Sequence, residues 1–368
     1  MLKKLLTSGM IILFLFCNIP FTTISDENNC NLNAKTLYVG GDGPGNYTKI
    51  QDAINDSSDG DTVFVYNGTY YESINIGNSI ILQGEDKFST IIDGRGILYN
   101  LIGIDKGDTH IFGFTVVNSS RSSGSSGITM SSSNNVISNT YIGIRVYGDK
   151  NYISNNIIEN NYWGISLSAN YNYIEENEII NNSNCGIYIQ IDFYHDNVIR
   201  GNSFVGKTFR FGGLDVPKYN KIINNTVDGK LQVFLISETN KNINYEAGQI
   251  ILMNCKNIQI KNQNISNINT GIELQNSKNC IVSNCKIYNT GIGIKILGSD
   301  KNSIINNEIF QNGEGIYLEN SHNNKINDNI FRNNNLGVEL YYFYMTGGCS
   351  LNEITYNSFV EKQCWSSY

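Results

Sequence analysis

Histidine, methionine and proline are scarce in this sequence, and positive charge is nowhere concentrated. The 368 residues include 3 histidines, 5 methionines and 3 prolines. Copper sites are built from clustered His, Met and Cys side chains, whereas His110, His195 and His322 are far apart in the sequence, so we expect no metal site. The net charge is −7 and no Lys/Arg cluster is present, which argues against nucleic acid as a partner.

Long apolar runs are also absent beyond the N-terminus. Lys3 and Lys4 precede an apolar run at 10–19, and small residues occupy positions 23 and 25. The run is shorter than the roughly 20 residues that span a bilayer, and the pattern is typical of a signal peptide. We therefore expect a signal peptide at 1–25, a secreted or cell-surface protein and no membrane span in the mature chain; an uncleaved anchor is the alternative.

Asparagine and isoleucine, in contrast, are abundant, and they recur with a fixed period. The chain has 58 asparagines, a residue that favours turns over helices. A Gly-Ile or Gly-Val pair begins at positions spaced by 22 residues, namely Gly271, Gly293, Gly315 and Gly337. Apolar and polar residues alternate after each glycine, which indicates a strand with one buried face.

Two further positions accompany each glycine at constant offsets. Asn302 and Asn307 precede Gly315 by 13 and 8 residues, and the next coil repeats both offsets. Each coil should therefore contain three short strands and three turns. Stacked coils predict an all-β fold, a single-stranded right-handed parallel β-helix, in which asparagines form ladders of amide hydrogen bonds and tolerate left-handed turns. A helical solenoid is the alternative, but the two-residue alternation argues against it.

The chain is expected to divide into three parts. After the signal peptide at 1–25, residues 34–110 form an N-terminal cap and the first coils, and residues 111–368 form the regular repeats of about 22 residues. The cap contains a short helix near 47–54, where Thr48 and Gln51 have capping-box spacing. Residues 204–218 and 337–352 break the period and are interpreted as loops.

The cysteines leave disulfide pairing open. Once Cys17 leaves with the signal peptide, seven cysteines remain, which is an odd number. Outside the cytoplasm, Cys280 with Cys285 or Cys349 with Cys364 could pair as disulfides, and inert thiols are the alternative. No cofactor is expected.

Several passages resemble known families. The stretch around 47–84 resembles the N-terminus of pectin-lyase-fold proteins. The passages Val227-Asp-Gly-Lys230 and Gly248-Gln-Ile-Ile-Leu-Met253, with the coils, resemble archaeal surface proteins carrying NosD-like repeats, also called carbohydrate-binding and sugar-hydrolase (CASH) repeats. The resemblance covers roughly residues 34–368. It implies a parallel β-helix outside the cytoplasm, with a polysaccharide or surface glycan as partner and envelope proteins as further candidates.

Outward positions of the Gly-Ile strands supply the candidate catalytic residues. These positions form two columns, which start after Gly164 and Gly186 and are expected to continue after Gly271. Tyr317 and Glu339 fall in one column, and Glu319 and Tyr341 fall in the other. Glu319 and Glu339 therefore lie diagonally on adjacent coils, roughly 7 Å apart, and the two tyrosines complete the square. Two carboxylates at such a distance suit inverting glycoside hydrolysis, and the tyrosines could stack on sugar rings. A solvated sheet face is the alternative.

A second candidate group combines aromatic and polar residues: Tyr188, Asp192, Tyr194 and His195. Rings with carboxylates and amides suit carbohydrate binding, and a bulged turn is the alternative. Three functions therefore stay open: a non-catalytic surface protein that binds carbohydrate or contributes to the envelope, a polysaccharide hydrolase or lyase, and a NosD-type copper accessory protein.

Overall fold

The computed structural model of this protein describes most of the chain after residue 33. The described residues are 34–95, 100–118, 126–130, 136–138, 143–190, 193–212, 219–341, 348–360 and 364–367, with backbone alone for 136–138 and 364–367. The expected signal peptide and Asp192 lie outside them, so both stay predictions.

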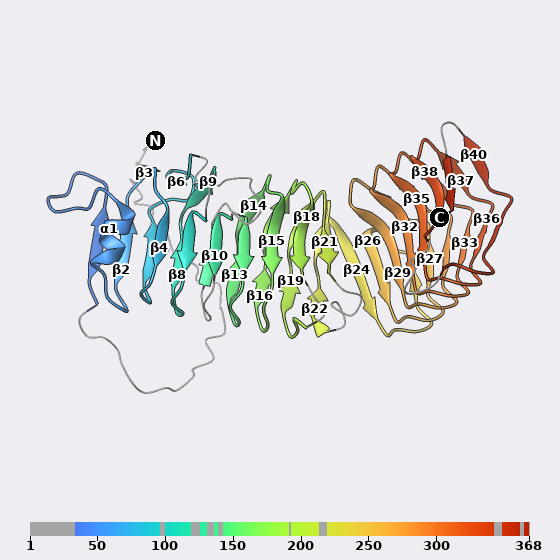
Figure 1. Ribbon diagram of the computed structural model, residues 1–368, viewed down its shortest axis with the longest axis horizontal. Coiled ribbons are helices and arrows are strands. Elements are labelled where there is room, and N and C mark those ends of the chain that lie inside the picture. The colour runs from blue at the N-terminus through green and yellow to red at the C-terminus, as the bar shows by residue number, and fades with distance from the viewer. Residues whose placement is uncertain are drawn as a thin grey trace, which may run out of the picture. The chain divides into compact units, whose positions relative to one another are not determined.

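Short parallel strands wind into stacked coils (Figure 1), each strand pairing with its equivalent one coil away. In the N-terminal stack, residues 34–227, a first sheet contains β1 (Thr36–Val39), β2 (Thr62–Val65), β5 (Ile81–Gly84), β8 (His110–Phe112), β11 (Val136–Ser138), β13 (Tyr152–Ser154), β16 (Tyr173–Glu175), β19 (Val198–Arg200) and β22 (Lys221–Ile223). The second face contains β3 (Gly68–Tyr70), β6 (Thr90–Asp93) and β9 (Thr115–Val117), then β14 (Ile157–Glu159), β17 (Glu178–Ile180), β20 (Ser203–Val205) and β23 (Thr226–Val227). The third, here the N-terminal Gly-Ile sheet, contains β4 (Ile74–Ile76), β7 (Ile102–Ile104), β10 (Ile128–Met130), β12 (Ile144–Val146), β15 (Trp163–Leu167), β18 (Cys185–Ile189) and β21 (Phe209–Phe211).

The C-terminal stack, residues 230–367, also has three faces. Its Gly-Ile sheet contains β24 (Lys230–Ile236), β26 (Ala247–Met253), β29 (Thr270–Gln275), β32 (Ile292–Leu297), β35 (Glu314–Glu319), β38 (Leu336–Tyr341) and β41 (Cys364–Ser367). The other faces contain β25 (Asn242–Ile243), β27 (Gln259–Lys261), β30 (Ile281–Ser283), β33 (Ser303–Ile305), β36 (Lys325–Asn327) and β39 (Glu353–Thr355), and β28 (Asn264–Ser266), β31 (Lys286–Tyr288), β34 (Glu308–Phe310), β37 (Ile330–Arg332) and β40 (Ser358–Val360). The predicted all-β parallel β-helix is thereby confirmed.

The predicted N-terminal helix is present as α1 (Ile50–Asn55), and its side chains Ile50, Ala53 and Ile54 are buried. The predicted capping box is wrong, because the N-cap residue is Lys49 and its side chain makes no capping bond. Instead the carboxylate of Glu72 accepts the backbone N–H groups of Ile50 and Gln51, at 2.8 and 3.0 Å. A residue 22 positions away, delivered by the next coil, thus satisfies the free donors of the first turn.

Asparagine ladders join successive coils as predicted. Asn307 is 1% exposed, and its Oδ1 accepts the backbone N–H of Cys285 from the preceding coil at 2.9 Å. Its Nδ2 donates to the Asn329 Oδ1 of the following coil and to the carbonyl of Val282. The same bonds recur at the other turn and in the N-terminal stack, for example between Asn156 and Asn177. Buried amides therefore carry hydrogen bonds along the stack where an unpaired polar group would be costly.

The left-handed corner is a separate position, one residue before the ladder. Asn306 has φ 55° and is exposed, whereas Asn307 beside it is buried. Asn155 and Asn156 divide the two roles in the same way. In each of these Asn-Asn pairs, the first asparagine adopts the left-handed backbone conformation and the second provides the buried side chain of the ladder.

The repeated glycine is required by close stacking. A Cβ atom on Gly315 would lie 2.4 Å from the carbonyl oxygen of Gly337 and 3.0 Å from the ring of Phe331. Gly293 faces Gly315 in the same way, at 2.5 Å. A side chain at this corner would force adjacent coils apart, which explains the glycine at the start of each strand.

A hairpin interrupts the winding between the two stacks. Asp228 and Gly229 both have positive φ, 48° and 75°, and turn β23 into β24, which runs antiparallel to it. Asp-Gly is a preferred pair for such a tight turn. From β24 onward the strands pair in parallel again. The Val227-Asp-Gly-Lys230 passage is therefore the point where the regular winding of the coils is interrupted and starts again.

Because of this hairpin, one prediction is wrong. The outward columns after Gly164 and Gly186 were expected to continue after Gly271 on one face, but β15, β18 and β21 belong to a sheet that ends at β21. The C-terminal Gly-Ile sheet instead continues the face of β14, β17, β20 and β23. The two Gly-Ile sheets are thus separate surfaces.

Buried polar contacts tie the stacks together. The Thr208 hydroxyl lies 2.9 Å from Gln249 Oε1 and 3.0 Å from Asn269 Oδ1. Gln232 Nε2 also donates to Gln249 Oε1, at 2.7 Å. All seven residues of β26 are buried. The Gly248-Gln-Ile-Ile-Leu-Met253 passage therefore serves the junction between the stacks.

Candidate functional site

Glu319 and Glu339 occupy the positions predicted for them on the C-terminal Gly-Ile sheet. Tyr317 of β35 pairs with Glu339 of β38, and Glu319 pairs with Tyr341, so the two carboxylates lie on a diagonal. With a rise of about 3.3 Å per residue and strands about 4.8 Å apart, their Cα atoms are about 8 Å apart. The Tyr317 and Tyr341 rings are 5.8 Å apart between centroids. The four residues predicted as one cluster are thus brought together.

A hydrogen bond links two members of this cluster. The Tyr317 hydroxyl donates to Glu319 Oε2 at 2.9 Å. Burial raises the pKa of Tyr317, and the bond to Glu319 and the charge of Glu339 raise it further. The hydroxyl therefore stays a donor, and one oxygen of Glu319 is held in place by it.

A third carboxylate, Glu314, completes the cluster and was missed from the sequence. It opens β35, and its Oε2 is buried without a hydrogen-bond partner among the described residues. Burial raises the pKa of Glu314, the charge of Glu339 raises it further, and Lys295 opposes both. The equivalent positions in neighbouring coils are Thr270, Ile292 and Leu336. The column of equivalent residues therefore gave no sign of an ionisable group there.

The cluster has an excess of negative charge. The four strands β29, β32, β35 and β38 contain four glutamates and one lysine. That lysine, Lys295, lies 3.9 Å from the carboxylate of Glu273. The raised pKa of Glu314 favours its protonated form relative to an ordinary glutamate, and a carboxyl with a raised pKa beside a second carboxylate is the arrangement of a general acid beside a base.

The N-terminal Gly-Ile sheet carries a different surface. The Trp163 and Tyr188 rings are 5.1 Å apart, and the guanidinium of Arg210 lies 5.5 Å from the Tyr188 ring. Arg210 Nη1 donates to Asn184 Oδ1 at 3.2 Å, and Asn184 Nδ2 donates to the Tyr162 hydroxyl at 2.8 Å. Of these residues only Tyr188 was predicted, because Arg210 lies in the stretch interpreted as a loop, where the structure has strand β21.

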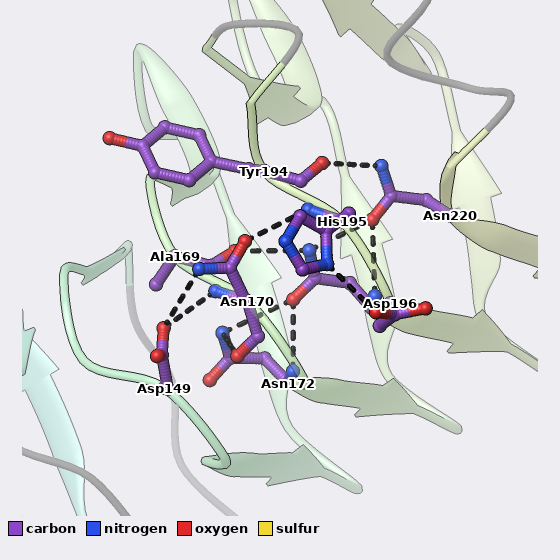
Figure 2. Close-up of polar contacts among 9 residues, drawn as sticks. Asp149, Ala169, Asn170, Asn172, Tyr194, His195, Asp196 and Asn220 are labelled. Carbon is purple, nitrogen blue, oxygen red and sulfur yellow. Dashed lines mark hydrogen bonds and ion pairs between the residues drawn. The ribbon is translucent and has the colours of Figure 1, made fainter.

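The rest of the second predicted group belongs to a turn. His195 Nδ1 lies 2.7 Å from Asp196 Oδ2, and the His195 backbone N–H donates to Asn170 Oδ1 at 3.0 Å (Figure 2). The Tyr194 ring packs against the core, and its carbonyl accepts from Asn220 Nδ2. No described contact joins Tyr194 or His195 to Tyr188. Tyr194 and His195 act as corner residues in these contacts, and a role in carbohydrate binding stays a prediction.

A hollow of about 520 Å³ lies next to β22, beside the junction of the stacks. Its lining includes the apolar side chains Ile222, Phe234 and Ile236 of β22 and β24, and also Asp196 and Lys221. Of the strands in the two Gly-Ile sheets, only β24 contributes side chains to the lining of this hollow.

The described cysteines are free thiols: Cys185, Cys255, Cys280, Cys285 and Cys349. The predicted Cys280–Cys285 disulfide is therefore not formed. Strand β30 separates the two residues, and its three extended residues, at about 3.3 Å each, already exceed the roughly 7 Å that a disulfide spans. The Cys364 side chain lies outside the described residues, so a pairing with Cys349 stays a prediction.

Comparison with known proteins identifies the family. Residues 54–245 and 235–364 match the family described as periplasmic copper-binding protein (NosD). The chain belongs to the NosD family. No protein of curated function matches it in sequence.

Solved structures of low identity align with this NosD-family chain. The mannuronan C-5 epimerase AlgE4 A-module of Azotobacter vinelandii has 17% identity and a TM-score of 0.40, over 90% of this chain and 98% of that one. The Dettilon tailspike protein has 14% identity and a TM-score of 0.44, over 86% and 68%. The catalytic domain of a GH87 alpha-1,3-glucanase has 13% identity and a TM-score of 0.42, over 90% and 68%.

The family description implies copper, and the described residues do not fit it. They contain no group of three or more His, Cys, Asp or Glu side chains that could hold a metal ion. His322 Nδ1 lies 2.7 Å from the Ser350 hydroxyl, and His195 is bonded to Asp196. Burial raises the pKa of Cys285 to about 11, which keeps the thiol protonated, whereas a metal binds the thiolate.

A membrane-spanning segment was also sought. Among the described residues, no helix is both long enough and apolar enough to cross a bilayer.

Proposed function

We propose that this NosD-family protein works outside the cytoplasm, where it binds carbohydrate or contributes to the cell envelope without catalysis. The observation that supports binding is the pair of Tyr317 and Tyr341 rings, 5.8 Å apart beside carboxylates on one sheet. Aromatic faces pack against the apolar faces of sugars, and the polar groups beside them orient hydroxyls. The family's periplasmic description supports the location.

The rigidity of the scaffold favours recognition over closure around a substrate. Both tyrosines stand on strands of a continuous parallel sheet, and the Tyr317 hydroxyl is fixed by Glu319. Rings already fixed before binding lose little conformational freedom when a sugar docks.

The test is binding to a panel of glycans, with Tyr317→Ala and Tyr341→Ala as variants. Truncating an aromatic anchor costs more than about 1 kcal/mol, so each change should weaken binding at least about fivefold to tenfold. Tyr356, which is 85% exposed in a turn outside the C-terminal Gly-Ile sheet, is the matched control. Equal effects of Tyr356→Ala and Tyr341→Ala, or no glycan bound, would contradict the proposal.

The alternative is a polysaccharide hydrolase or lyase, which the raised pKa of Glu314 beside Glu339 favours. Inverting glycoside hydrolysis needs a protonated acid and an ionised base at roughly 6.5–9.5 Å. The test is release of reducing or unsaturated ends from a polysaccharide. Glu339→Gln should abolish this release, and Glu308→Gln, on the neighbouring sheet, should leave it unchanged. That result would establish this function in place of simple binding.

A further inference from the structure

We propose that the N-terminal Gly-Ile sheet is a second binding surface, specific for an anionic polysaccharide that lies across strands β12, β15, β18 and β21. This inference rests on the proposed carbohydrate function and names the class of ligand for a surface separate from the Glu319–Glu339 cluster.

Charge distinguishes the two Gly-Ile sheets. The strands β12, β15, β18 and β21 contain two arginines and no Asp or Glu. The equivalent C-terminal strands β29, β32, β35 and β38 contain four glutamates and one lysine. The same position in the repeat therefore presents positive charge in one stack and negative charge in the other, in a chain whose net charge is −7.

The arginines stand in one outward column. Arg145 pairs with Ser166, Ser166 with Tyr188, and Tyr188 with Arg210. Strand spacings of about 4.8 Å place Arg145 about 14 Å from Arg210 along the stack. A linear polymer crossing these strands would therefore pass both arginine positions of the column.

Arg210 is exposed and is not neutralised by a described carboxylate. Its guanidinium lies over the Tyr188 ring and donates to the neutral amide of Asn184. By contrast, Arg200 lies 2.9 Å from Glu175, and Arg332 lies 2.8 Å from Glu308. Because a guanidinium has five donors in a planar fork, Arg210 keeps the capacity to bind a carboxylate or sulfate with two bonds.

The groups between the two arginines suit a sugar ring. The Trp163 ring lies beside the Tyr188 ring at an interplanar angle of 42°, and Tyr162 is 63% exposed at the margin of the same strands. Aromatic faces beside cations match the apolar faces and the negative charges of an acidic polysaccharide.

The experiment measures binding of the full protein to three polymers at low and high salt. The polymers are polygalacturonate, which carries carboxylates, dextran sulfate, which carries sulfates, and neutral dextran. Preferred binding to an anionic polymer, weakened by salt because exposed charges are screened, is expected, and the stronger of the two identifies the anionic group.

Substitutions locate the site. Arg210→Gln should weaken binding of the anionic polymer at least tenfold, and Arg145→Gln should weaken it as well. Arg200→Gln, on another face of the same coils, is the matched control and should have no effect. Equal loss in Arg200→Gln, no loss in Arg210→Gln, or equal affinity for single-stranded oligothymidylate would overturn the inference. Binding of dextran alone would overturn it while supporting carbohydrate binding, and failure to bind any glycan would refute both.

Discussion

Asn307 allows the contribution of the ladder to be measured against a neighbour of the same type. In Asn307→Ala, the Cys285 N–H loses its acceptor, and the Val282 carbonyl and Asn329 Oδ1 each lose a donor. Each buried group left unsatisfied costs about 1–3 kcal/mol. Asn329 Oδ1 is affected less, because it still accepts the backbone N–H of residue 307. We therefore expect the free energy of unfolding to fall by about 2–5 kcal/mol.

Asn306→Ala is the control, because Asn306 is exposed and has a left-handed backbone. It should cost about 1 kcal/mol from that backbone conformation alone, and Asn306→Gly should cost nothing, because glycine adopts positive φ freely. Urea unfolding followed by circular dichroism gives the free energies, and hydrogen exchange should show lost protection at the Cys285 amide in Asn307→Ala only. Equal costs for the two alanine variants, or unchanged protection at Cys285, would refute the ladder as the source of stability.

Three further predictions concern the ends of the ladders, the junction and the buried thiols. Cys285→Asn should extend its ladder by one coil and raise the free energy of unfolding by about 1 kcal/mol, measured in urea; a loss would show that the thiol is better packed than an amide. Thr208→Val removes the hydroxyl that contacts Gln249 and Asn269 and should cost about 1–3 kcal/mol, with exchange protection lost in β26; unchanged exchange there would contradict the junction contacts. Burial raises the pKa of Cys185 to about 12 and of Cys285 to about 11 from 9.0. Because folding favours the protonated thiols, their contribution to the free energy of unfolding is complete below pH 9 and is lost as the pH rises towards 11. Alkylation of the native protein followed by mass spectrometry should therefore label the half-buried Cys349 before Cys185 or Cys285. Equal labelling of the three thiols would contradict the buried, protonated state of Cys185 and Cys285.

The sequence predicted what depends on one coil and its immediate neighbours. The 22-residue period placed Glu319, Glu339, Tyr317 and Tyr341 correctly because strand pairing carries each residue onto its equivalent one coil away. It also predicted the asparagine ladders, although the left-handed corner proved to be a separate residue from the ladder residue.

Features that break the period could not be predicted in this way. Glu314 replaces apolar or neutral residues at its position, and Arg210 lies in a stretch whose spacing looked like a loop. The capping of α1 by Glu72 depends on which residue the next coil delivers. Each of these requires knowing how non-equivalent residues meet in space.

The sequence by itself determined the solenoid, because period, alternation and turn chemistry are local properties repeated many times. Only the tertiary structure decided that the Gly-Ile strands form two separate sheets. The Asp228-Gly229 turn is recognisable as a turn, but its consequence depends on which sheet β24 joins after the reversal. That pairing separates the basic aromatic surface around Arg210 from the acidic one around Glu339, because strand partners across the junction are chosen by long-range packing rather than by the repeat.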